Sequence, residues 1–258
     1  TLESSSAASD VYKRQMYVIT SEWSKEFKNI EDKNSEPMYY ENLPFRFDTR
    51  GIIYNKRSHV YKVNIQTKKF IKIVDGDAKD IISIESMVEG EKGLVLSFDQ
   101  YNSKGTMLEE KIGAIEGSKI KEIYSQGSMG NLFYYEDGLH AVGMRKRFDW
   151  PTNTTVLKIS NTGKVSYKYR LFDRNIVKAE VNEAILYFLY EDSGKTLLRD
   201  GTNNVDLINS KVTIKDFAFN NEQTFVIANS FSNPDEIYEL NNGQLTKISK
   251  ANESFTKK

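Results

Sequence analysis

Short runs of β-forming residues, separated by turn residues, fill the chain from residue 51 onward, and no stretch keeps a helical period. Runs such as 61–65 and 238–240 alternate apolar and polar side chains, which predicts strands with one face nearer water. Four other runs are apolar almost throughout, which predicts strands covered on both faces; they are residues 94–98, 140–144, 184–190 and 224–228. The pattern therefore predicts an all-β chain.

The turn signals give this pattern a period. Two families of hairpin turns alternate, so that each repeat holds two hairpins, and hence four strands, in about 40–50 residues. That period is typical of a β-propeller blade. The first family lies near Thr67, Gly117, Thr162, Thr202 and Asn242, and the second near Gly90, Asp137, Asn182 and Asn221. We predict a partial blade at 51–74 and four full blades at 81–125, 131–170, 176–210 and 211–249.

A burial argument favours the propeller over other hairpin-built folds. A single small twisted sheet cannot cover both of its faces, whereas blades packed face to face cover each other. A β-sandwich also uses hairpins, but it does not require a double hairpin to recur at regular spacing. We therefore predict an all-β fold, a β-propeller fragment of about four to five four-stranded antiparallel blades. By the same reasoning the end blades leave uncovered apolar faces, around Ile52 and Ile53 at one end and residues 225–227 at the other.

The first fifteen residues do not follow this pattern. The segment 10–15 reads DVYKRQ, which a transposase mosaic-end sequencing adapter encodes in one frame. We interpret residues 1–15 as a read-through scar and expect no regular structure there. The remaining division is a lead-in strand and loop at 16–50, the partial propeller at 51–250, and a tail at 251–258.

Composition excludes several classes of partner and chemistry. The 258 residues contain 36 Lys and Arg against 36 Asp and Glu, which argues against a nucleic-acid or anionic-membrane partner. The longest apolar run, 184–190, is too short to span a bilayer. The absence of cysteine removes disulfides and thiolate metal sites, and it favours a reducing cytoplasm.

No catalytic machinery is visible in the sequence. The G-x-S-x-G pattern of a hydrolase nucleophile is absent, because the glycines around Ser128 are wrongly spaced. His59 and His140, the two histidines, lie at strand starts and are interpreted as hydrogen-bonded structural imidazoles. We therefore expect no catalytic, cofactor-binding or metal-binding residues, and no cofactor; substrate-binding residues stay unassigned.

Three further patterns imitate functional motifs. Residues 191–196 read EDSGKT like a phosphate loop, but Leu189 stands where the upstream glycine is required, which favours a hairpin turn. Asp75, Gly76, Asp77 and Asp80 resemble a calcium loop, but Ser86 replaces the distal glutamate, which favours a polar turn between strands. The acidic pairs Glu109–Glu110 and Glu22–Glu26 are ordinary surface charges unless the fold brings a pair into a cleft.

The order of several segments resembles a known family. They are ENLPFRFDTRG at 41–51, RSHVYKVNI at 57–65, KIVDGD at 72–77, FYYEDG at 133–138, and SNPDEIYEL at 232–240 followed by QLT at 244–246. Together they resemble the propeller of prolyl-oligopeptidase-family serine peptidases, in particular the acylaminoacyl-peptidase-like branch. Thr49–Arg50 departs from the family's usual Asp-Gly turn.

The resemblance to this family implies a function, although no single motif in the sequence indicates one. In such enzymes the propeller precedes an α/β-hydrolase domain that carries Ser, Asp and His, and it limits access to short peptides. We therefore expect a non-catalytic, cytoplasmic domain whose partners are short peptides and the hydrolase domain of the same parent chain. That domain would begin after residue 258, further N-terminal blades would precede the chain, and the parent would be an acylaminoacyl- or dipeptidyl-peptidase-like enzyme.

Two other functions stay open on the sequence alone. One is a stand-alone binding propeller of the TolB-like kind. The other is a propeller glycosidase, which would need two carboxylates facing each other across the central channel. The coding sequence beyond residue 258 distinguishes the peptidase from the binding module, because only the peptidase continues into a strand-turn-helix region with G-x-S-x-G.

Overall fold

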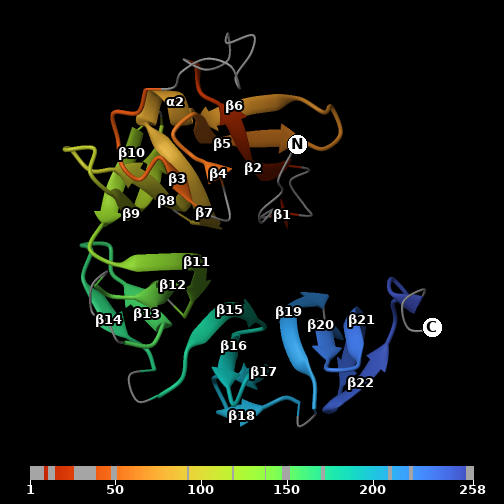
Figure 1. The fold of residues 1–258 in the computed structure, drawn as a ribbon. Coiled ribbons are helices and arrows are strands. Elements are labelled where there is room, and N and C mark those ends of the chain that lie inside the picture. Colours follow the sequence, from red (N-terminus) through yellow and green to blue (C-terminus); the bar gives the residue numbers. More distant parts are fainter. Residues whose placement is uncertain are drawn as a thin grey trace. The chain divides into compact units, whose positions relative to one another are not determined.

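The computed structural model describes residues 9–10, 15–25, 39–47, 51–91, 93–117, 119–136, 138–146, 152–169, 172–208, 211–220 and 223–253. It is an all-β fold whose described strands form five four-stranded antiparallel sheets and one two-stranded sheet (Figure 1). The predicted fold class, a propeller fragment of four to five such blades, is confirmed.

Four of the sheets follow one another from residue 81, and each uses four strands that are consecutive in the chain. Their strands coincide with the four blades predicted from the turn spacing. The second sheet holds β7 (Ile81–Gly90), β8 (Gly93–Tyr101), β9 (Leu108–Glu116) and β10 (Lys119–Tyr124), and the third holds β11 (Ser128–Tyr135), β12 (Gly138–Met144), β13 (Thr155–Ile159) and β14 (Val165–Tyr167). The fourth holds β15 (Ile176–Asn182), β16 (Ile185–Asp192), β17 (Lys195–Asp200) and β18 (Val205–Asp206), and the fifth holds β19 (Thr213–Asn220), β20 (Gln223–Ser230), β21 (Asn233–Asn241) and β22 (Gln244–Lys247).

The first sheet begins earlier than residue 51, where we placed the start of the propeller. Its strand order is β1 (Ser9–Asp10), β2 (Gln15–Trp23), β5 (Lys56–Asn64) and β6 (Phe70–Val74). β2 pairs with β5 without interruption along its whole length, and β1 pairs with the start of β2. The expectation of no regular structure in residues 1–15 is therefore wrong for Ser9, Asp10 and Gln15, which lie in these strands. The sequence analysis set the division at residue 15 from the adapter-like segment and placed the strand after it in a lead-in at 16–50. That strand was therefore not counted as part of this blade.

The segment between β2 and β5 contains a two-stranded sheet of β3 (Arg46–Phe47) and β4 (Gly51–Ile52). Ile53 follows this hairpin and is buried against Tyr54, Tyr101 and Leu108. The expectation that Ile52 and Ile53 lie on an uncovered blade face is therefore wrong, since Ile53 packs onto the second sheet and Ile52 is half-buried. One short helix, α2 (Gly76–Lys79), joins β6 to β7.

Apolar clusters form the core between successive sheets. Ile19 and Val60 of the first sheet pack with Ile81 and Leu96 of the second. A second cluster joins the third and fourth sheets, and a third joins the fourth and fifth. In sheets two to five the predicted apolar runs lie in the second strand, at β8, β12, β16 and β20. Blade-on-blade burial of these strands is the main stabilising contribution of the fold.

One of the four apolar runs does not behave as predicted. In β20, Val226 is buried but its neighbour Ile227 is 36% exposed. Because successive side chains of a strand point to opposite faces, β20 is covered on one face only. The prediction of two covered faces is wrong for this strand, whereas the exposure of Ile227 agrees with the separate expectation of an uncovered apolar face at residues 225–227.

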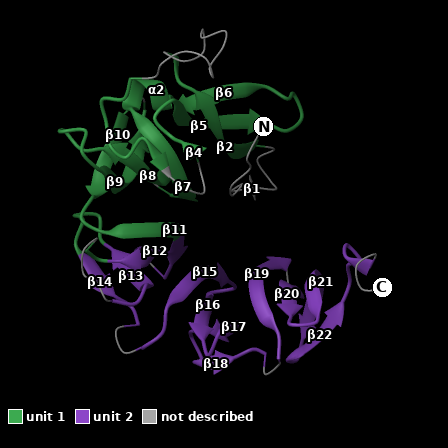
Figure 2. Ribbon diagram, in the orientation of Figure 1, with its two compact units in different colours: residues 1–132, 145–149, 160–164 green, residues 133–144, 150–159, 165–258 purple. Residues whose placement is uncertain are grey.

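The chain divides into two compact units, which are coloured separately in Figure 2. The first unit contains residues 1–132, 145–149 and 160–164, and the second contains residues 133–144, 150–159 and 165–258. Among the described helices none is long and apolar enough to cross a membrane.

Candidate functional site

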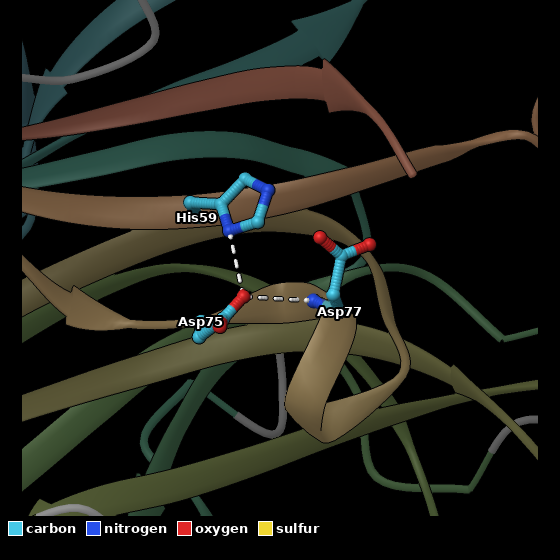
Figure 3. A group of neighbouring side chains, drawn as sticks. All are labelled: His59, Asp75 and Asp77. Carbon is cyan, nitrogen blue, oxygen red and sulfur yellow. Dashed lines mark hydrogen bonds and ion pairs between the residues drawn. The ribbon is translucent and has the colours of Figure 1, made fainter. Parts of the chain in front are cut away.

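A cluster of polar side chains lies on the first sheet, where β5 meets the turn between β6 and α2. Figure 3 shows its centre, His59 on β5 with Asp75 and Asp77 at the start of α2. One ligand-type atom of each of these three residues lies within 4.8 Å of the other two. We call them, together with Glu22, Tyr61 and Lys72, the polar cluster.

The local backbone explains why these residues meet. Asp75 is the N-cap of α2, and its Oδ1 accepts a hydrogen bond of 3.2 Å from the Asp77 amide. The Gly76 amide donates instead to Nδ1 of His59, at 3.1 Å. Gly76 is required for this approach, because a Cβ at its position would stand 2.1 Å from the Ser58 carbonyl oxygen. The helix start therefore has two caps, one local and one from β5.

The hydrogen bond fixes the state of His59. Because Nδ1 accepts from an amide, the neutral ring carries its proton on Nε2. The side chain is fully buried, and burial is the main reason that its pKa lies below the usual value, followed by the nearby charge of Lys72. Nε2 is buried without a hydrogen-bond partner among the described residues, and the nearest carboxylate oxygen in an ion-pair geometry, on Glu22, is 3.9 Å away.

A second part of the polar cluster surrounds Glu22 on β2. Its Oε1 accepts a hydrogen bond of 2.8 Å from the Tyr61 hydroxyl. Burial and this bond to the carboxylate raise the pKa of Tyr61. The Lys72 ammonium stands 5.3 Å from the centre of the Tyr61 ring and 4.0 Å from Asp75. Sequence analysis missed this network, because β2 is distant in sequence from the β5–β6 hairpin and only the register between β2 and β5 brings Glu22 to Tyr61 and Lys72.

The chemistry of the cluster is that of a structural cap rather than of a preformed metal site. A cation at Nδ1 of His59 would have to displace the Gly76 amide from the same lone pair. Asp75 already accepts from an amide and lies 4.0 Å from the ammonium groups of both Lys25 and Lys72. The interpretation of this segment as a polar turn agrees with the structure, and Asp80 of the calcium-like pattern pairs with Arg57 at 2.8 Å.

His140 lies on β12, in the second unit, and adopts the other tautomer. Its Nδ1 is 3.0 Å from the Gly138 carbonyl oxygen, which can only accept, so Nδ1 carries the proton. The ring stacks on Phe133 with centroids 5.6 Å apart and meets Tyr135 edge-on at 5.7 Å. Burial lowers its pKa. Each histidine is thus buried with one nitrogen hydrogen-bonded to the backbone, as the sequence analysis interpreted them.

The remaining sequence patterns also take ordinary structural roles. The phosphate-loop imitation is the turn between β16 and β17, with Ser193 and Gly194 at φ 50° and 73°. A hollow of about 490 Å³ adjoins this turn, and the ion pair between Arg174 and Asp192, at 2.6 Å, belongs to its lining. Ser128 is the first residue of β11, and its hydroxyl donates a hydrogen bond of 3.0 Å to the Glu110 carboxylate.

The two acidic pairs do not form a carboxylate dyad among the described residues. The Glu110 carboxylate accepts hydrogen bonds from the Ser128 hydroxyl and the Met129 amide at the start of β11. The Glu109 carboxylate lies 3.5 Å from the Lys111 ammonium. Glu22 belongs to the polar cluster, and Glu26 lies outside the described residues. A glycosidase interpretation gains no support from these residues, since it needs two carboxylates that flank a substrate.

Comparison with known proteins identifies the fold. The sequence matches no known family and no curated protein. The structure matches acylaminoacyl peptidase from Pyrococcus horikoshii with a TM-score of 0.73 and 14% identity, over 98% of this chain and 39% of that one. An acylaminoacyl peptidase in complex with Z-Gly-Gly-Phe-chloromethyl ketone gives 0.74 and 13% identity, over 99% of this chain and 39% of that one.

A third solved structure is a propeller domain by itself. The β-propeller domain of the Trilobed protease from Pyrococcus furiosus matches with a TM-score of 0.51 and 11% identity, covering 96% of this chain and 84% of that one. The chain thus spans 39% of the length of the acylaminoacyl peptidases and most of an isolated peptidase propeller. The predicted resemblance is confirmed at the level of the fold: these five sheets have the architecture of a peptidase β-propeller.

Proposed function

We propose that this chain is the non-catalytic propeller domain of a prolyl-oligopeptidase-like serine peptidase, which limits the access of short peptides to a hydrolase domain of the same parent chain. The observation that carries the proposal is the coverage. Nearly all of this chain, 98%, aligns with only 39% of an acylaminoacyl peptidase. The order of segments along the sequence, from 41–51 to 244–246, supports the same assignment.

The described residues support the non-catalytic part of the proposal. Covalent catalysis needs a nucleophile within hydrogen-bond reach of a base. His59 and His140 are fully buried, and the bonds that they make go to backbone groups. Ser128 donates to a glutamate rather than to an imidazole. We therefore place the catalytic residues of the parent enzyme outside residues 1–258. The absence of cysteine supports a cytoplasmic location.

Two measurements on the parent enzyme test the gating role. The full-length enzyme should hydrolyse short peptides and spare folded proteins, whereas a version without residues 1–258 should lose this discrimination. Equal cleavage of a folded protein and a short peptide by the full-length enzyme would contradict gating. A coding sequence that stops after residue 258 would contradict the peptidase assignment itself and favour the stand-alone binding propeller.

A further inference from the structure

A hollow of about 250 Å³ lies on the second sheet, between the end of α2 and the outer strands β9 and β10. Its lining begins at Lys79, the last residue of α2, and ends at Glu122 of β10, so the hollow belongs to the first compact unit alone. It shares no residue with the polar cluster. We call it the sheet hollow.

The floor of the sheet hollow is apolar. Ile81 of β7 and Phe98 of β8 line it, and both belong to the buried cluster between the first and second sheets. Ile120 of β10 also lines it, is half-buried, and packs against the same cluster. A ligand in the hollow would therefore rest on side chains whose positions are already fixed by the core.

Gly113 of β9 determines how these side chains lie. A Cβ at this position would stand 2.4 Å from Cγ2 of Ile120 and 3.3 Å from Cε1 of Phe98. A glycine inside a strand often marks a place where another group comes close to the backbone. The missing side chain at Gly113 therefore lets Phe98 and Ile120 lie close together against β9, which keeps the floor near the sheet.

The polar wall of the sheet hollow is held by Gln100 and Lys111. The Gln100 side-chain amide donates a hydrogen bond of 2.7 Å to the Lys79 carbonyl, and its Oε1 accepts one of 3.1 Å from the Lys111 ammonium. That ammonium also lies 3.5 Å from the Glu109 carboxylate and 3.6 Å from the Glu122 carboxylate. These contacts join α2 to β8, β9 and β10, so the wall is organised before a ligand binds.

The lining carries a surplus of positive charge. Its charged groups are the ammonium groups of Lys79, Lys111 and Lys119 and the carboxylate of Glu122, which leaves two positive charges. Lys111 is balanced by the two carboxylates beside it. No ion pair joins Lys79 or Lys119 to another residue of the described part of the chain. These two lysines are therefore available to an anionic group of a ligand.

We propose that the sheet hollow binds a small apolar monocarboxylate, with its hydrocarbon part on Phe98 and Ile120 and its carboxylate toward Lys79 and Lys119. An apolar floor with a few placed polar groups is typical of small-molecule sites. A non-hydrogen atom needs roughly the 30 Å³ that a water molecule takes in the liquid, so the hollow holds about eight such atoms, the size of hexanoate. This site is separate from the proposed gating role and does not depend on it.

Amide NMR of the ¹⁵N-labelled 258-residue chain, titrated with hexanoate, tests the proposal. We expect saturable shifts at the amides of Ile81, Gly113 and Ile120, with a dissociation constant of about 0.1–10 mM because the ligand is small. Hexanamide has nearly the same shape without the charge and should bind at least about threefold more weakly. Inorganic phosphate has the charge without the hydrocarbon and should leave these three amides unshifted.

Two variants on β10 distinguish the site from general surface charge. Lys119→Gln removes an ammonium group from the lining and should raise the dissociation constant for hexanoate about two- to fivefold. The matched control is Lys121→Gln on the same strand, because Lys121 is not part of the lining and its ammonium pairs with Glu116 at 3.5 Å. This control should leave the constant unchanged. Both lysines are exposed, so neither substitution should prevent folding.

The dipeptide Gly-Leu identifies the source of the carboxylate. Binding tighter than that of hexanoate would assign a peptide C-terminus to the sheet hollow, and weaker binding would assign a free acid. The absence of saturable shifts up to about 50 mM hexanoate would overturn the proposal. Equal affinity for hexanoate and hexanamide would overturn it as well, as would equal effects of Lys119→Gln and Lys121→Gln. Shifts with phosphate as large as those with hexanoate would show an adventitious anion site only.

Discussion

The first and the fifth sheet differ in the side chains that they carry on the face that does not pack on a neighbouring sheet. Each has one face packed on a neighbouring sheet and one face turned away from it. On the first sheet that second face carries the polar cluster, in which His59 is buried and Glu22 and Asp75 have hydrogen-bond donors. On the fifth sheet it carries three isoleucines, Ile227, Ile237 and Ile248, whose exposed fractions are 36%, 42% and 51%.

The difference shows what a sheet face needs to stand alone. Polar groups can satisfy one another within a single sheet and its adjoining turn, and the polar cluster does so for all of its named hydrogen bonds, while Nε2 of His59 has no partner among the described residues. Apolar side chains gain nothing from their neighbours until water is removed, so the three isoleucines are stabilised only where another surface covers them. Mutations in a face that is covered by a neighbouring sheet should therefore destabilise the fold most, and mutations in the polar cluster or at the edge of the fifth sheet should destabilise it less.

The largest effect is expected in a face that is covered. Leu186 is fully buried between the third and fourth sheets, with Val156 and Phe188 in the same cluster. Leu186→Asp removes that packing and buries a charge, so it should cost at least about 4 kcal/mol and abolish cooperative unfolding of the second unit. The control Glu191→Lys, at an exposed site on the same strand, should change the thermal midpoint little. Equal midpoints for both variants would contradict the burial account.

A smaller loss is expected when the caps of the polar cluster are disturbed. Gly76→Ala places a Cβ against the Ser58 carbonyl and should move the amide away from His59. We expect a destabilisation of about 2 kcal/mol in denaturant unfolding. Gly130→Ala is a matched control, because a Cβ at Gly130 meets nothing within 4 Å. If both variants unfolded alike, the close approach at Gly76 would not be a source of stability.

Acid should weaken the fold through its two histidines. The pKa of both His59 and His140 is lowered in the folded state, mainly by burial. The unfolded chain therefore binds more protons, so stability is retained above about pH 6.5 and is lost as the pH falls below it, by at most about 1.4 kcal/mol per pH unit for each histidine. Lys72 adds to the shift at His59, while Glu22, Asp75 and Asp77 oppose it.

The variant His59→Asn keeps a side-chain acceptor but does not titrate. Its unfolding free energy should depend less steeply on pH between 5 and about 6.5 than that of the unchanged chain. Identical pH slopes would show that His59 does not hold its neutral state in the fold.

The smallest effect is expected at the edge of the fifth sheet. Glu236 is buried and accepts hydrogen bonds from the Ser249 hydroxyl and from the amides of Ala251 and Asn252. These bonds, with that from Ser249 first, lower its pKa to about 2. This contribution is therefore present above about pH 4.5 and lost as the pH falls toward 2. Glu236→Gln should speed amide hydrogen exchange at residues 249–253 at neutral pH, and unchanged exchange would contradict this anchoring role.

The sequence predicted the repeated part of the fold better than its ends. The turn spacing located β7 to β22 because each hairpin turn has a local signal, such as Ser193 and Gly194 at positive φ. It could not show that β2 pairs with β5, because that pairing spans the whole segment from 24 to 55. The apolar pattern of the strands alone did not distinguish β16, covered on both faces, from β20, whereas the count of blades placed residues 225–227 on an end face.

The candidate site was less predictable. His59 and the Asp75–Asp77 segment were noticed separately, but their contact depends on Gly76 packing against β5. Glu22 was noticed only as a surface charge, since nothing in the sequence places it beside Tyr61. Local patterns therefore identify turns and strands, whereas polar networks require the register between strands.

The central proposal is that these 258 residues are part of a serine peptidase and do not contain its nucleophile. Labelling the full-length parent with a fluorophosphonate, followed by peptide mapping, tests it most directly, because the probe reacts with an activated serine. We predict a single labelled serine that lies outside residues 1–258 and no labelling of the isolated chain. A labelled serine within these residues, or a parent protein that the probe does not label at all, would contradict the account.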